Sequence, residues 1–265
     1  MSTTTHALVT GATGGIGRAI ALALARQAHR DQVPLRITAA ASRQSEVLDT
    51  LVAELRAAGA EAVGLAADLT DAAQCRRLVD EAQAAQGDLT VLVSNAGQSG
   101  PGRLADLTAE QWDSTFALNC RSTWLLAQAA REGLARTRGS IVAIASMSGL
   151  HPHPGYGAYS PAKAALVMLC RQLAQEWAAD GIRTNAVCPG MIRTPLTEPV
   201  YRDADTKARR EALVPLSRIG TPEDVAQAVV YLAGPGAAYV TGQSLLVDGG
   251  ISDRMLSLIP GRPGK

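Results

Sequence analysis

Tyr159 and Lys163 stand four residues apart, a spacing that would allow the pair to transfer a proton. On a helix, side chains at this spacing lie on one face and can meet. An unperturbed tyrosine has a pKa of about 10, so a phenol is a weak acid at neutral pH. A neighbouring ammonium favours the phenolate, and we therefore expect Lys163 to lower the pKa of Tyr159 towards the working range of a general acid. Because Tyr-x-x-x-Lys also occurs by chance in many helices, the rest of the chain must decide whether this pair is functional.

Short apolar runs alternate with longer amphipathic stretches along the chain. Continuous apolar strands separated by helices indicate a parallel sheet that is covered on both faces. Strands are predicted at residues 6–10, 35–41, 62–66, 91–93, 141–145, 184–188 and 244–247. Helices are predicted at 16–27 and 46–58, after Asp71, after the capping box at Thr108, around Tyr159, and after Thr221 and Pro222. The polar stretch 28–34 is expected to be a connecting loop. The pattern predicts an α/β fold, with one doubly wound domain of about seven parallel strands over residues 1–265.

Two segments do not follow this alternation. Residues 190–215 come directly after a predicted strand and carry mixed charge. In an open α/β sheet, ligands lie outside the carboxyl ends of the strands, so this segment is a candidate substrate lid, with a plain surface insertion as the alternative. The tail at 251–265 is expected to cross a subunit interface or to be disordered.

A glycine-rich turn lies between the first predicted strand and the first predicted helix. Residues 10–17, Thr-Gly-Ala-Thr-Gly-Gly-Ile-Gly, have the spacing Gly-x-x-x-Gly-x-Gly. Glycines let the backbone approach a pyrophosphate, and the helix N-terminus offers free N–H groups. A plain tight turn is the alternative, but the position after a strand favours dinucleotide binding. The absence of a following Gly-Lys-Ser or Gly-Lys-Thr disfavours a nucleoside triphosphatase loop.

The residues after the second predicted strand indicate which dinucleotide would bind. A carboxylate there would bind the adenosine ribose and repel a 2′-phosphate. The segment 39–44 has no acid and offers Ser42 and Arg43, which suits NADP(H); a solvated loop arginine is the alternative. Asp68, after the third strand, is expected to contact the adenine edge.

The overall composition narrows the class of protein. With 25 basic and 24 acidic residues the net charge is +1, which argues against a nucleic acid or an anionic membrane as partner. The four cysteines have neither metal-ligand nor disulfide spacing, so we expect reduced thiols and no metal site. The first residues lack the features of an export signal, and no apolar segment has transmembrane length. We therefore expect a soluble cytoplasmic protein.

In the order and separation of its motifs, the chain resembles the short-chain dehydrogenase/reductase family. The matching motifs are Thr10-Gly11 to Gly17, Asp68-Leu69, Asn95-Ala96-Gly97, Asn119, Ser146, Tyr159 with Lys163, Pro189-Gly190 with Thr194, and Val247 to Gly250. The resemblance implies a Rossmann-type domain that transfers hydride between a nicotinamide cofactor and a carbonyl or secondary alcohol. It implies that Tyr159 donates the proton, Lys163 also binds the nicotinamide ribose, Ser146 (with Ser148 as its competitor) holds the substrate oxygen, and Asn119 positions a water.

The resemblance also implies two sets of binding residues. The cofactor set comprises Gly11, Thr13, Gly14, Gly15, Ile16, Gly17, Ser42, Arg43, Asp68, Leu69, Asn95, Ala96, Gly97, Tyr159, Lys163, Pro189, Gly190, Ile192 and Thr194. The substrate-pocket set comprises Gln98, Ser146, His153, Tyr156, Met191 and Leu196. NADP(H) is the preferred cofactor, and NAD(H) is the alternative.

Within the family, the pattern looks most like 3-oxoacyl-carrier-protein reductases and their secondary-alcohol relatives. The resemblance implies reduction of a ketone or 3-oxoacyl-type carbonyl, with a small molecule or an acyl thioester as substrate. The alternatives are an NAD-dependent dehydrogenase of a sugar or polyol and a catalytically silent redox sensor. Relatives are commonly homodimers or homotetramers that pair the helices at 117–131 and 159–178, where Ala127, Ala130, Leu166 and Leu169 are small or apolar.

Ser94 replaces the first Asn of the usual Asn-Asn-Ala-Gly, a mild change, and three further positions depart from the family pattern. Thr90 stands where an aspartate often precedes the fourth strand, so one structural polar contact is expected to be lost. Gly14 occupies a place where many NADP(H)-dependent relatives have Arg or Lys. Asp180 stands where carrier-protein reductases commonly have a basic residue, so we prefer a small or medium carbonyl as substrate, with the acyl-carrier substrate as one member of that set.

Overall fold

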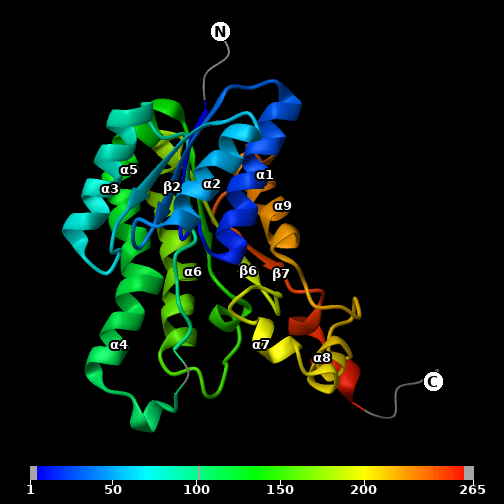
Figure 1. Ribbon diagram of the computed structural model, residues 1–265. Coiled ribbons are helices and arrows are strands. Elements are labelled where there is room, and N and C mark those ends of the chain that lie inside the picture. Colours follow the sequence, from blue (N-terminus) through cyan, green and yellow to red (C-terminus); the bar gives the residue numbers. More distant parts are fainter. Residues whose placement is uncertain (1–4, 101, 260–265) are drawn as a thin grey trace.

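Parallel strands separate two layers of helices in the computed structural model, which describes residues 5–100 and 102–259 (Figure 1). Over those residues seven strands form one sheet in the order β3-β2-β1-β4-β5-β6-β7, and every neighbouring pair is parallel. The strands are β1 (Thr5–Thr10), β2 (Leu35–Ala41), β3 (Glu61–Ala66), β4 (Val91–Ser94), β5 (Ser140–Ile144), β6 (Arg183–Pro189) and β7 (Ser244–Val247). The strand order reverses between β1 and β4, so a ligand crevice is expected beyond their carboxyl ends. This architecture confirms the predicted doubly wound α/β fold.

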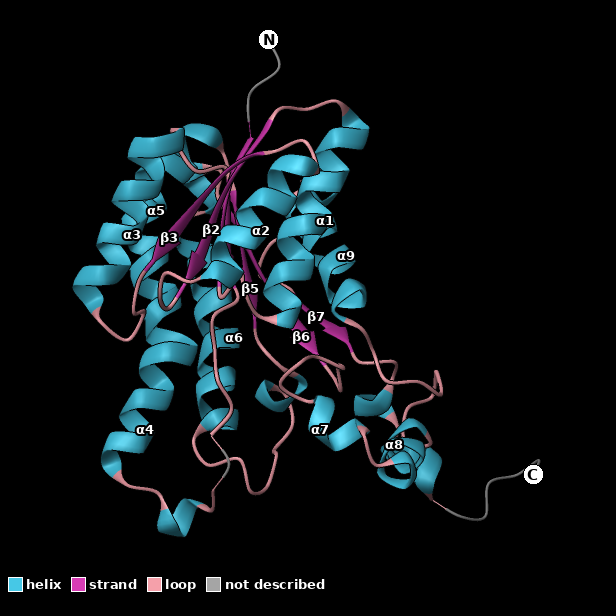
Figure 2. Cartoon of the chain, in the orientation of Figure 1, coloured by secondary structure: helices cyan, strands magenta, loops and turns pink. Residues whose placement is uncertain are grey.

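The helices cover both faces of the sheet, as predicted (Figures 1 and 2). Buried residues of α1 (Gly15–Asp31), α2 (Glu46–Ala57) and α9 (Pro222–Ala233) form one core cluster with the strands. Those of α3 (Ala72–Gln86) and α5 (Ser122–Thr137) form a second one, and buried residues of α6 (Tyr159–Glu176) form a third with β5 and β6. The helices α4 (Ala109–Phe116), α7 (Glu198–Tyr201) and α8 (Ala204–Glu211) lie beyond the carboxyl ends of the strands in Figure 1.

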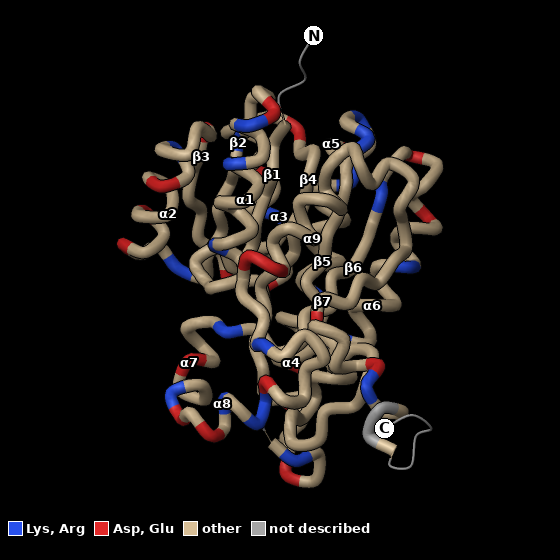
Figure 3. The backbone as a smooth tube through the Cα atoms, turned by 90° about the vertical axis from the view of Figure 1, so that its right-hand side faces the viewer, with Lys and Arg blue, Asp and Glu red and all other residues tan. Residues whose placement is uncertain are grey.

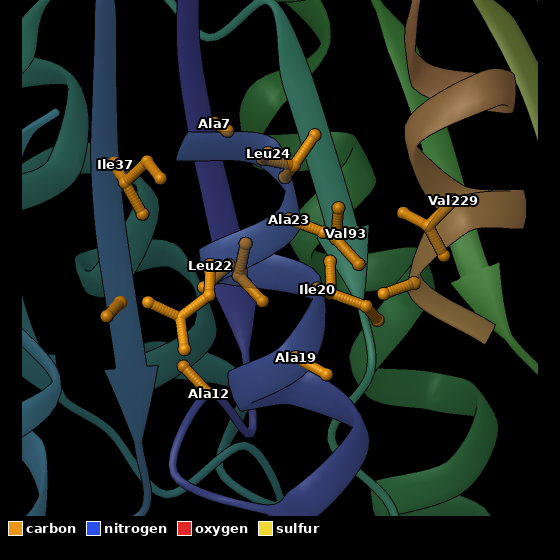
Figure 4. Close-up of a cluster of buried hydrophobic side chains, with 14 of the residues drawn as sticks. Ala7, Ala12, Ala19, Ile20, Leu22, Ala23, Leu24, Ile37, Val93 and Val229 are labelled. Atoms are coloured by element: carbon orange, nitrogen blue, oxygen red, sulfur yellow. The ribbon is translucent and has the colours of Figure 1, made fainter. Parts of the chain in front are cut away.

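Small side chains allow α1 to pack closely on the sheet (Figure 4). Ala19 and Ala23 of α1 are 8% exposed, and Ile20 between them is fully buried. These residues share a cluster with Val93 of β4 and Val229 of α9. Burying apolar surface of this kind contributes about 25 cal/mol for each Å² removed from water. Because α1 is fixed against the sheet, the glycine-rich turn that precedes it is fixed as well.

The first helix is longer than predicted. It continues through His29 and Arg30 to Asp31, so most of the polar stretch predicted as a loop is helical. The exposed polar residues of this stretch are compatible with a helix. His29 and Arg30 lie in the last turn, where basic side chains interact favourably with the negative end of the helix dipole. The helix ends at Gln32, which has a φ of 57° and donates from its backbone N–H to the carbonyls of Ala28 and His29.

Thr90 makes the contact that was expected to be lost. Its hydroxyl accepts a hydrogen bond from the backbone N–H of His6 at 2.9 Å and donates to the carbonyl of His6 at 3.0 Å. A threonine can make both bonds because a hydroxyl both donates and accepts. The start of β4 is therefore tied to β1 without an aspartate, and that prediction is wrong.

The helices α5 and α6 were expected to pair between subunits. Most of the small or apolar residues named for that contact are instead buried in the core of this chain. Ala127, Ala130 and Leu166 are 0–1% exposed and belong to the clusters on the sheet. The exposed apolar residues on α5 and α6 include Trp124, at 43%, and Met168, at 57%. In the part of the chain that the structure describes, no helix is both long and apolar enough to span a membrane.

Candidate active site

The glycine-rich turn has the shape required to hold a phosphate. Gly11 has a φ of +60°, a conformation that side chains rarely adopt. A methyl group at Gly17 would overlap the carbonyl oxygen of Gly11 and lie 2.5 Å from Asn95 Nδ2. Among the described residues, no side chain caps α1 at Gly14 and no acid occupies its first turn. The N–H groups at the start of α1 are therefore available to an anion.

Thr10 and Asn95 hold this turn in place. The amide of Asn95 donates to the carbonyl oxygens of Thr10 and Gly11, at 3.0 and 3.1 Å. The fully buried hydroxyl of Thr10 accepts from the backbone N–H groups of Asn95 and Ala96, at 3.0 and 3.1 Å. Asn95 thus supports the turn with its side chain, and Thr10 was missing from the predicted cofactor set. A hydroxyl at the end of an apolar strand was the signal that could have identified it.

The chain after β6 comes back over the glycine-rich turn. Gly190 donates its N–H to the carbonyl of Val247 at 3.0 Å, which holds the start of this segment beside β7. A methyl group at Gly15 would lie 3.0 Å from both Thr194 and Pro195. Ile192 is buried and pairs with Gly220. The predicted cofactor residues at 11–17 and 189–194 therefore face one another at one end of the sheet.

The residues predicted to bind the adenosine end of the cofactor lie at the same end of the sheet as the glycine-rich turn. The N–H of Ala12 donates to the carbonyl of Ala40 at 2.9 Å, which brings the exposed Ser42 and Arg43 next to the turn. Asp68 is exposed, and its carboxylate accepts from the N–H and hydroxyl of Thr70 at 2.9 and 2.7 Å. Leu69 is 6% exposed and packs in the core. Asp68 thus keeps an exposed carboxylate, whereas the side chain of Leu69 is structural.

Lys163 is a buried cation in this region, with only 3% of its surface exposed. Its Nζ donates to the carbonyl of Ile144, at the end of β5, over 2.8 Å and lies 5.7 Å from the centroid of the Tyr159 ring. Burial lowers the pKa of Lys163 to about 8, because the charged form loses its hydration. The nearby thiols of Cys120, Cys188 and Cys170 oppose that shift. The predicted Tyr–Lys pair is therefore brought together on α6.

The pKa of Tyr159 is shifted in the direction opposite to the one predicted. Burial raises the pKa of this phenol, a hydrogen bond with the side chain of Ser146 opposes the rise, and Tyr156 adds to it. Lys163 was expected to lower this pKa, but the loss of hydration is the largest cause of the shift in this structure. At neutral pH Tyr159 therefore holds its proton, and Ser146 is the side chain that opposes the rise in its pKa.

Asn119 lies in a π-helical turn, Ala117–Arg121, between α4 and α5. Its amide donates to the carbonyls of Thr115 and Gln98, both at 3.0 Å, and its Oδ1 accepts from the N–H of Gln98 at 3.3 Å. A methyl group at Gly97 would lie 2.7 Å from Asn119 Oδ1 and 3.2 Å from Lys163 Nζ. Gly97 therefore lies between these two side chains, and Asn119 secures the Gln98 backbone. Single π turns inside helices are frequent at functional sites.

Ser148, the competitor of Ser146, has a different set of partners. Its hydroxyl lies 3.0 Å from Nδ1 of His153, while its backbone N–H donates to Ser146 Oγ at 3.1 Å. The imidazole of His153 stacks on Tyr156 with ring centroids 3.8 Å apart. Ser148 thus orients His153, whereas Ser146 is the serine that affects the pKa of Tyr159.

The other predicted pocket residues are more scattered. Gln98 is exposed and bound to Asn119 through its backbone, and Leu196 is 77% exposed. Met191 lines a cavity of about 560 Å³ together with Leu216 and Leu246. None of the four predicted catalytic side chains lines that cavity. His153 and Tyr156 therefore lie beside the candidate catalytic group, whereas Met191 lines this cavity and the side chain of Leu196 is exposed.

No cluster of metal-ligating side chains was expected, and residues 5–100 and 102–259 contain no group of three or more His, Cys, Asp or Glu side chains that could hold a metal ion. The cysteines at 75, 120, 170 and 188 are free thiols. Burial raises the pKa of Cys188 to about 11 and that of Cys170 to about 12. These thiols are therefore protonated at neutral pH.

Replacing Lys163 with methionine is expected to stabilise the fold while abolishing activity. The pKa of Lys163 falls from 10.5 in the unfolded chain to about 8 in the folded chain. Below pH 8 the buried ammonium therefore lowers the free energy of unfolding by its full amount. At pH 7 the variant should gain on the order of 3 kcal/mol, and its advantage should shrink as the pH rises from 8 to 10.5. Urea denaturation at several pH values measures this effect. Lys207→Met removes a surface lysine paired with Glu211 and should change stability little; an equal gain in both variants would show that burial of Lys163 is not the cause.

Known proteins resemble this chain over nearly its whole length. A sequence profile of the family described as enoyl-(acyl carrier protein) reductase matches residues 11–252. The enzyme named 2-(S)-hydroxypropyl-CoM dehydrogenase 3, of Xanthobacter autotrophicus, is 39% identical over 249 residues, covering 92% of this chain and 95% of its own. The 3-oxoacyl-acyl-carrier-protein reductase of Thermotoga maritima is 34% identical and covers 92% of this chain and 96% of its own.

A solved structure agrees with these matches. The Pseudomonas aeruginosa RhlG/NADP active-site complex superposes with a TM-score of 0.85 at 30% identity, covering 94% of this chain and 96% of that one. The glycine-rich turn, the Tyr159–Lys163 pair and these matches all lead to one assignment. The chain belongs to the short-chain dehydrogenase/reductase family, whose members are oxidoreductases that act on CH–OH and C=O groups with nicotinamide cofactors.

Proposed function

We propose that this protein is an NADP(H)-dependent oxidoreductase that reduces a ketone to a secondary alcohol, with Tyr159 as the proton donor. The observation that carries the proposal is the joint placement of three side chains. Ser146 lies close enough to Tyr159 to oppose the rise in its pKa, and Lys163 is held at the end of β5 beside the same ring. A protein that only senses a nucleotide has no chemical need for this set, which makes the silent redox sensor the weaker alternative.

The residues of this chain fit a dinucleotide. The free N–H groups at the start of α1 would hold the pyrophosphate, and the missing side chain at Gly17 leaves the turn tight enough to approach it. Asp68 would contact the adenine edge and Lys163 the nicotinamide ribose, and Thr194, which lies beside Gly15, would also contact the cofactor. When bound, the nicotinamide supplies a hydride to the carbonyl carbon, or accepts one from the alcohol.

Tyr159 would donate and accept the proton in this reaction. In reduction its phenol donates a proton to the carbonyl oxygen, and in oxidation the phenolate takes the proton back. The raised pKa keeps the phenol protonated at neutral pH, which favours its role as donor. Ser146 would donate a hydrogen bond to the same oxygen and stabilise the charge that develops on it. Lys163 and Asn119, on either side of Gly97, would return a proton to Tyr159 from solvent through a water.

The test of this proposal is an absorbance assay with NADPH or NADH and a panel of ketones. We expect oxidation of NADPH that depends on the ketone. Arg43→Ala should raise the KM for NADPH about tenfold, the usual size of one lost charge-assisted hydrogen bond, and leave that for NADH unchanged. Arg76→Ala, which also removes an exposed arginine, is the control. Equal effects of Arg43→Ala on both cofactors would favour the NAD-dependent alternative.

Relatives support the choice of cofactor and substrate without deciding them. The Pseudomonas aeruginosa structure is a complex with NADP, and the Thermotoga maritima enzyme is named for a 3-oxoacyl substrate. The carbonyl could thus belong to a small ketone or to an acyl thioester. The alternative, an NAD-dependent dehydrogenase of a sugar or polyol, would be favoured by an acid near Ser42 that binds the ribose of NAD, and the segment 39–44 has none.

We also propose a homodimer or homotetramer and keep the expected cytoplasmic location as a prediction. The exposed Trp112, Trp124 and Met168 lie on α4, α5 and α6 and would be covered by a second copy. The tail predicted at 251–265 is described as far as residue 259, where Met255, Leu256 and Ile259 are exposed.

A further inference from the structure

Ser122 lies at the end of the π turn that carries Asn119. It is fully buried, and its hydroxyl donates to the carbonyl of Leu118 at 2.6 Å. The backbone N–H of Ser122 donates to the carbonyl of Ala117, five residues earlier, as in a π turn. In an ordinary α-helix that N–H would bind Leu118, which is four residues earlier. The hydroxyl of Ser122 therefore replaces the donor that the π turn takes from Leu118.

Asn119 makes a bond of the same kind inside the turn. Its side-chain amide donates to the carbonyl of Thr115, four residues earlier, at 3.0 Å. The same amide donates to the Gln98 carbonyl, and its Oδ1 accepts from the Gln98 N–H. A buried carbonyl that has no donor costs about as much free energy as a lost hydrogen bond. The side chains of Ser122 and Asn119 thus stabilise the widened turn, and this turn sets the direction in which Asn119 reaches Gln98.

The start of α5 is held separately from the turn. Thr123 is 2% exposed, and its hydroxyl lies 2.7 Å from that of Ser94, which is 3% exposed at the end of β4. The side chain of Arg121 donates to the carbonyl of Thr70 at 2.6 Å. With the beginning of the helix fixed in this way, any relaxation of the turn would move the residues that precede Arg121, and Asn119 is one of them.

No ion pair between described residues includes any residue of 117–121. Acidic and basic residues are interspersed along α7 and α8 in Figure 3, and these helices lie apart from α4 in Figure 1. The buried ammonium of Lys163 lies beyond Gly97 and donates to the carbonyl of Ile144. The hydroxyl of Ser122 and the amide of Asn119 therefore supply the side-chain hydrogen bonds inside the turn.

We infer that Ser122 is a positioning residue for the proposed reduction: its hydroxyl keeps the π turn in place and thereby holds Asn119 on the route by which a proton returns from solvent. This inference rests on the proposed function. Without the hydroxyl, the Leu118 carbonyl loses its side-chain donor, and the turn can move along the helix until this carbonyl regains a backbone N–H. Asn119 would then turn away from Gln98, and return of the proton to Tyr159 would become slower.

Hydrogen exchange of the Gln98 backbone N–H tests this contact without substrate or cofactor. The N–H donates to Asn119 Oδ1 at 3.3 Å, so its exchange rate, measured by NMR, reports whether the contact is made. Ser122→Ala should raise that rate about three- to tenfold, the usual effect of one lost hydrogen bond. Ser122→Cys, which has a similar volume and only a weak donor, should have the same effect and replaces the alanine variant if that variant does not fold.

Thr137→Val is the matched control. The hydroxyl of Thr137 also donates to the carbonyl four residues earlier, that of Gly133 at 3.1 Å, but it lies at the other end of α5. Its loss should leave the exchange rate of the Gln98 N–H as it is in the wild type. An equal rise in both variants would show a general loosening of α5 and would overturn the inference.

Kinetics test the link to the reaction. Ser122→Ala should lower kcat for ketone reduction about three- to tenfold and leave the KM for NADPH unchanged, and the solvent isotope effect on kcat should rise because proton return becomes slower. In an Asn119→Ala background, Ser122→Ala should lower kcat no further, since both changes act through the same amide.

The outcomes separate the inference from the proposed function. An unchanged Gln98 exchange rate in Ser122→Ala, or losses in kcat that add in the double variant with Asn119→Ala, would overturn the role of Ser122 and leave the proposed function intact. Failure of the wild type to reduce any ketone with either cofactor would overturn both.

Discussion

Tyr159→Phe is expected to lower kcat/KM for ketone reduction by about a hundred- to ten-thousand-fold, the usual contribution of a general acid. The ring is retained, so packing against Tyr156 and Lys163 should survive, and only the proton donor is lost. Ser146 would still hold the substrate oxygen, but a serine hydroxyl is too weak an acid to replace the phenol as proton donor. Steady-state NADPH oxidation measures the loss, and Tyr239→Phe, at a fully exposed tyrosine, is the control.

The direction of the Tyr159 pKa shift adds a pH dependence to this prediction. Because the pKa is raised, the phenol stays protonated through neutral pH and the rate of reduction should fall only at alkaline pH. The reverse oxidation needs the phenolate and should accelerate over the same alkaline range. Full activity of Tyr159→Phe in either direction would exclude Tyr159 as the acid.

Gly17→Ala is expected to have the largest effect on the cofactor site. The added methyl group overlaps the carbonyl of Gly11 and approaches the amide of Asn95, and both are fixed by the sheet. Relief requires the turn to shift, at a cost of about 1–3 kcal/mol in stability. The same shift displaces the N–H groups of the first turn, so NADPH affinity should fall at least about tenfold.

Gly14→Ala is the matched control for stability in this experiment. Its methyl group would meet only the carbonyl of Gly11, at 3.4 Å, and its φ of −78° suits any residue. Thermal unfolding of both variants and fluorescence titration with NADPH provide the measurements. If Gly17→Ala were as stable as Gly14→Ala and bound NADPH like the wild type, the proposed phosphate site at this turn would be wrong.

The elements that depend on local pattern were predicted well. The strands β2 and β7 have the predicted bounds. The predicted capping box at Thr108 is present, and the helix predicted to start after Thr221 also begins with a capping box. The glycine-rich turn and the pairing of Tyr159 with Lys163 follow from spacing alone, because each needs only the contacts of one turn or one helix. Their joint location follows from the order of parallel strands.

The errors arise where competing effects depend on packing. The sign of the Tyr159 pKa shift depends on how much hydration burial removes, and proximity to Lys163 alone does not show this. The roles of Thr10 and Ser148 come from hydrogen bonds between residues that are distant in sequence or separated by a tight turn. The end of α1 was misplaced because exposed polar residues are compatible with both a helix and a loop.

The π turn at Asn119 links the site to the length of the chain. A π turn holds one residue more than an α-helical turn, so losing one residue from 117–121 would let the turn close into ordinary α-helix. Ala127 and Ala130 of α5 would then stay in the core, whereas the residues of the turn would change direction and Asn119 would lose its contact with Gln98. A shortened chain could therefore lose this amide contact and keep its packing. The extra residue confines the placement of one polar side chain to a single turn, so this part of the site can change without change to the core of α5.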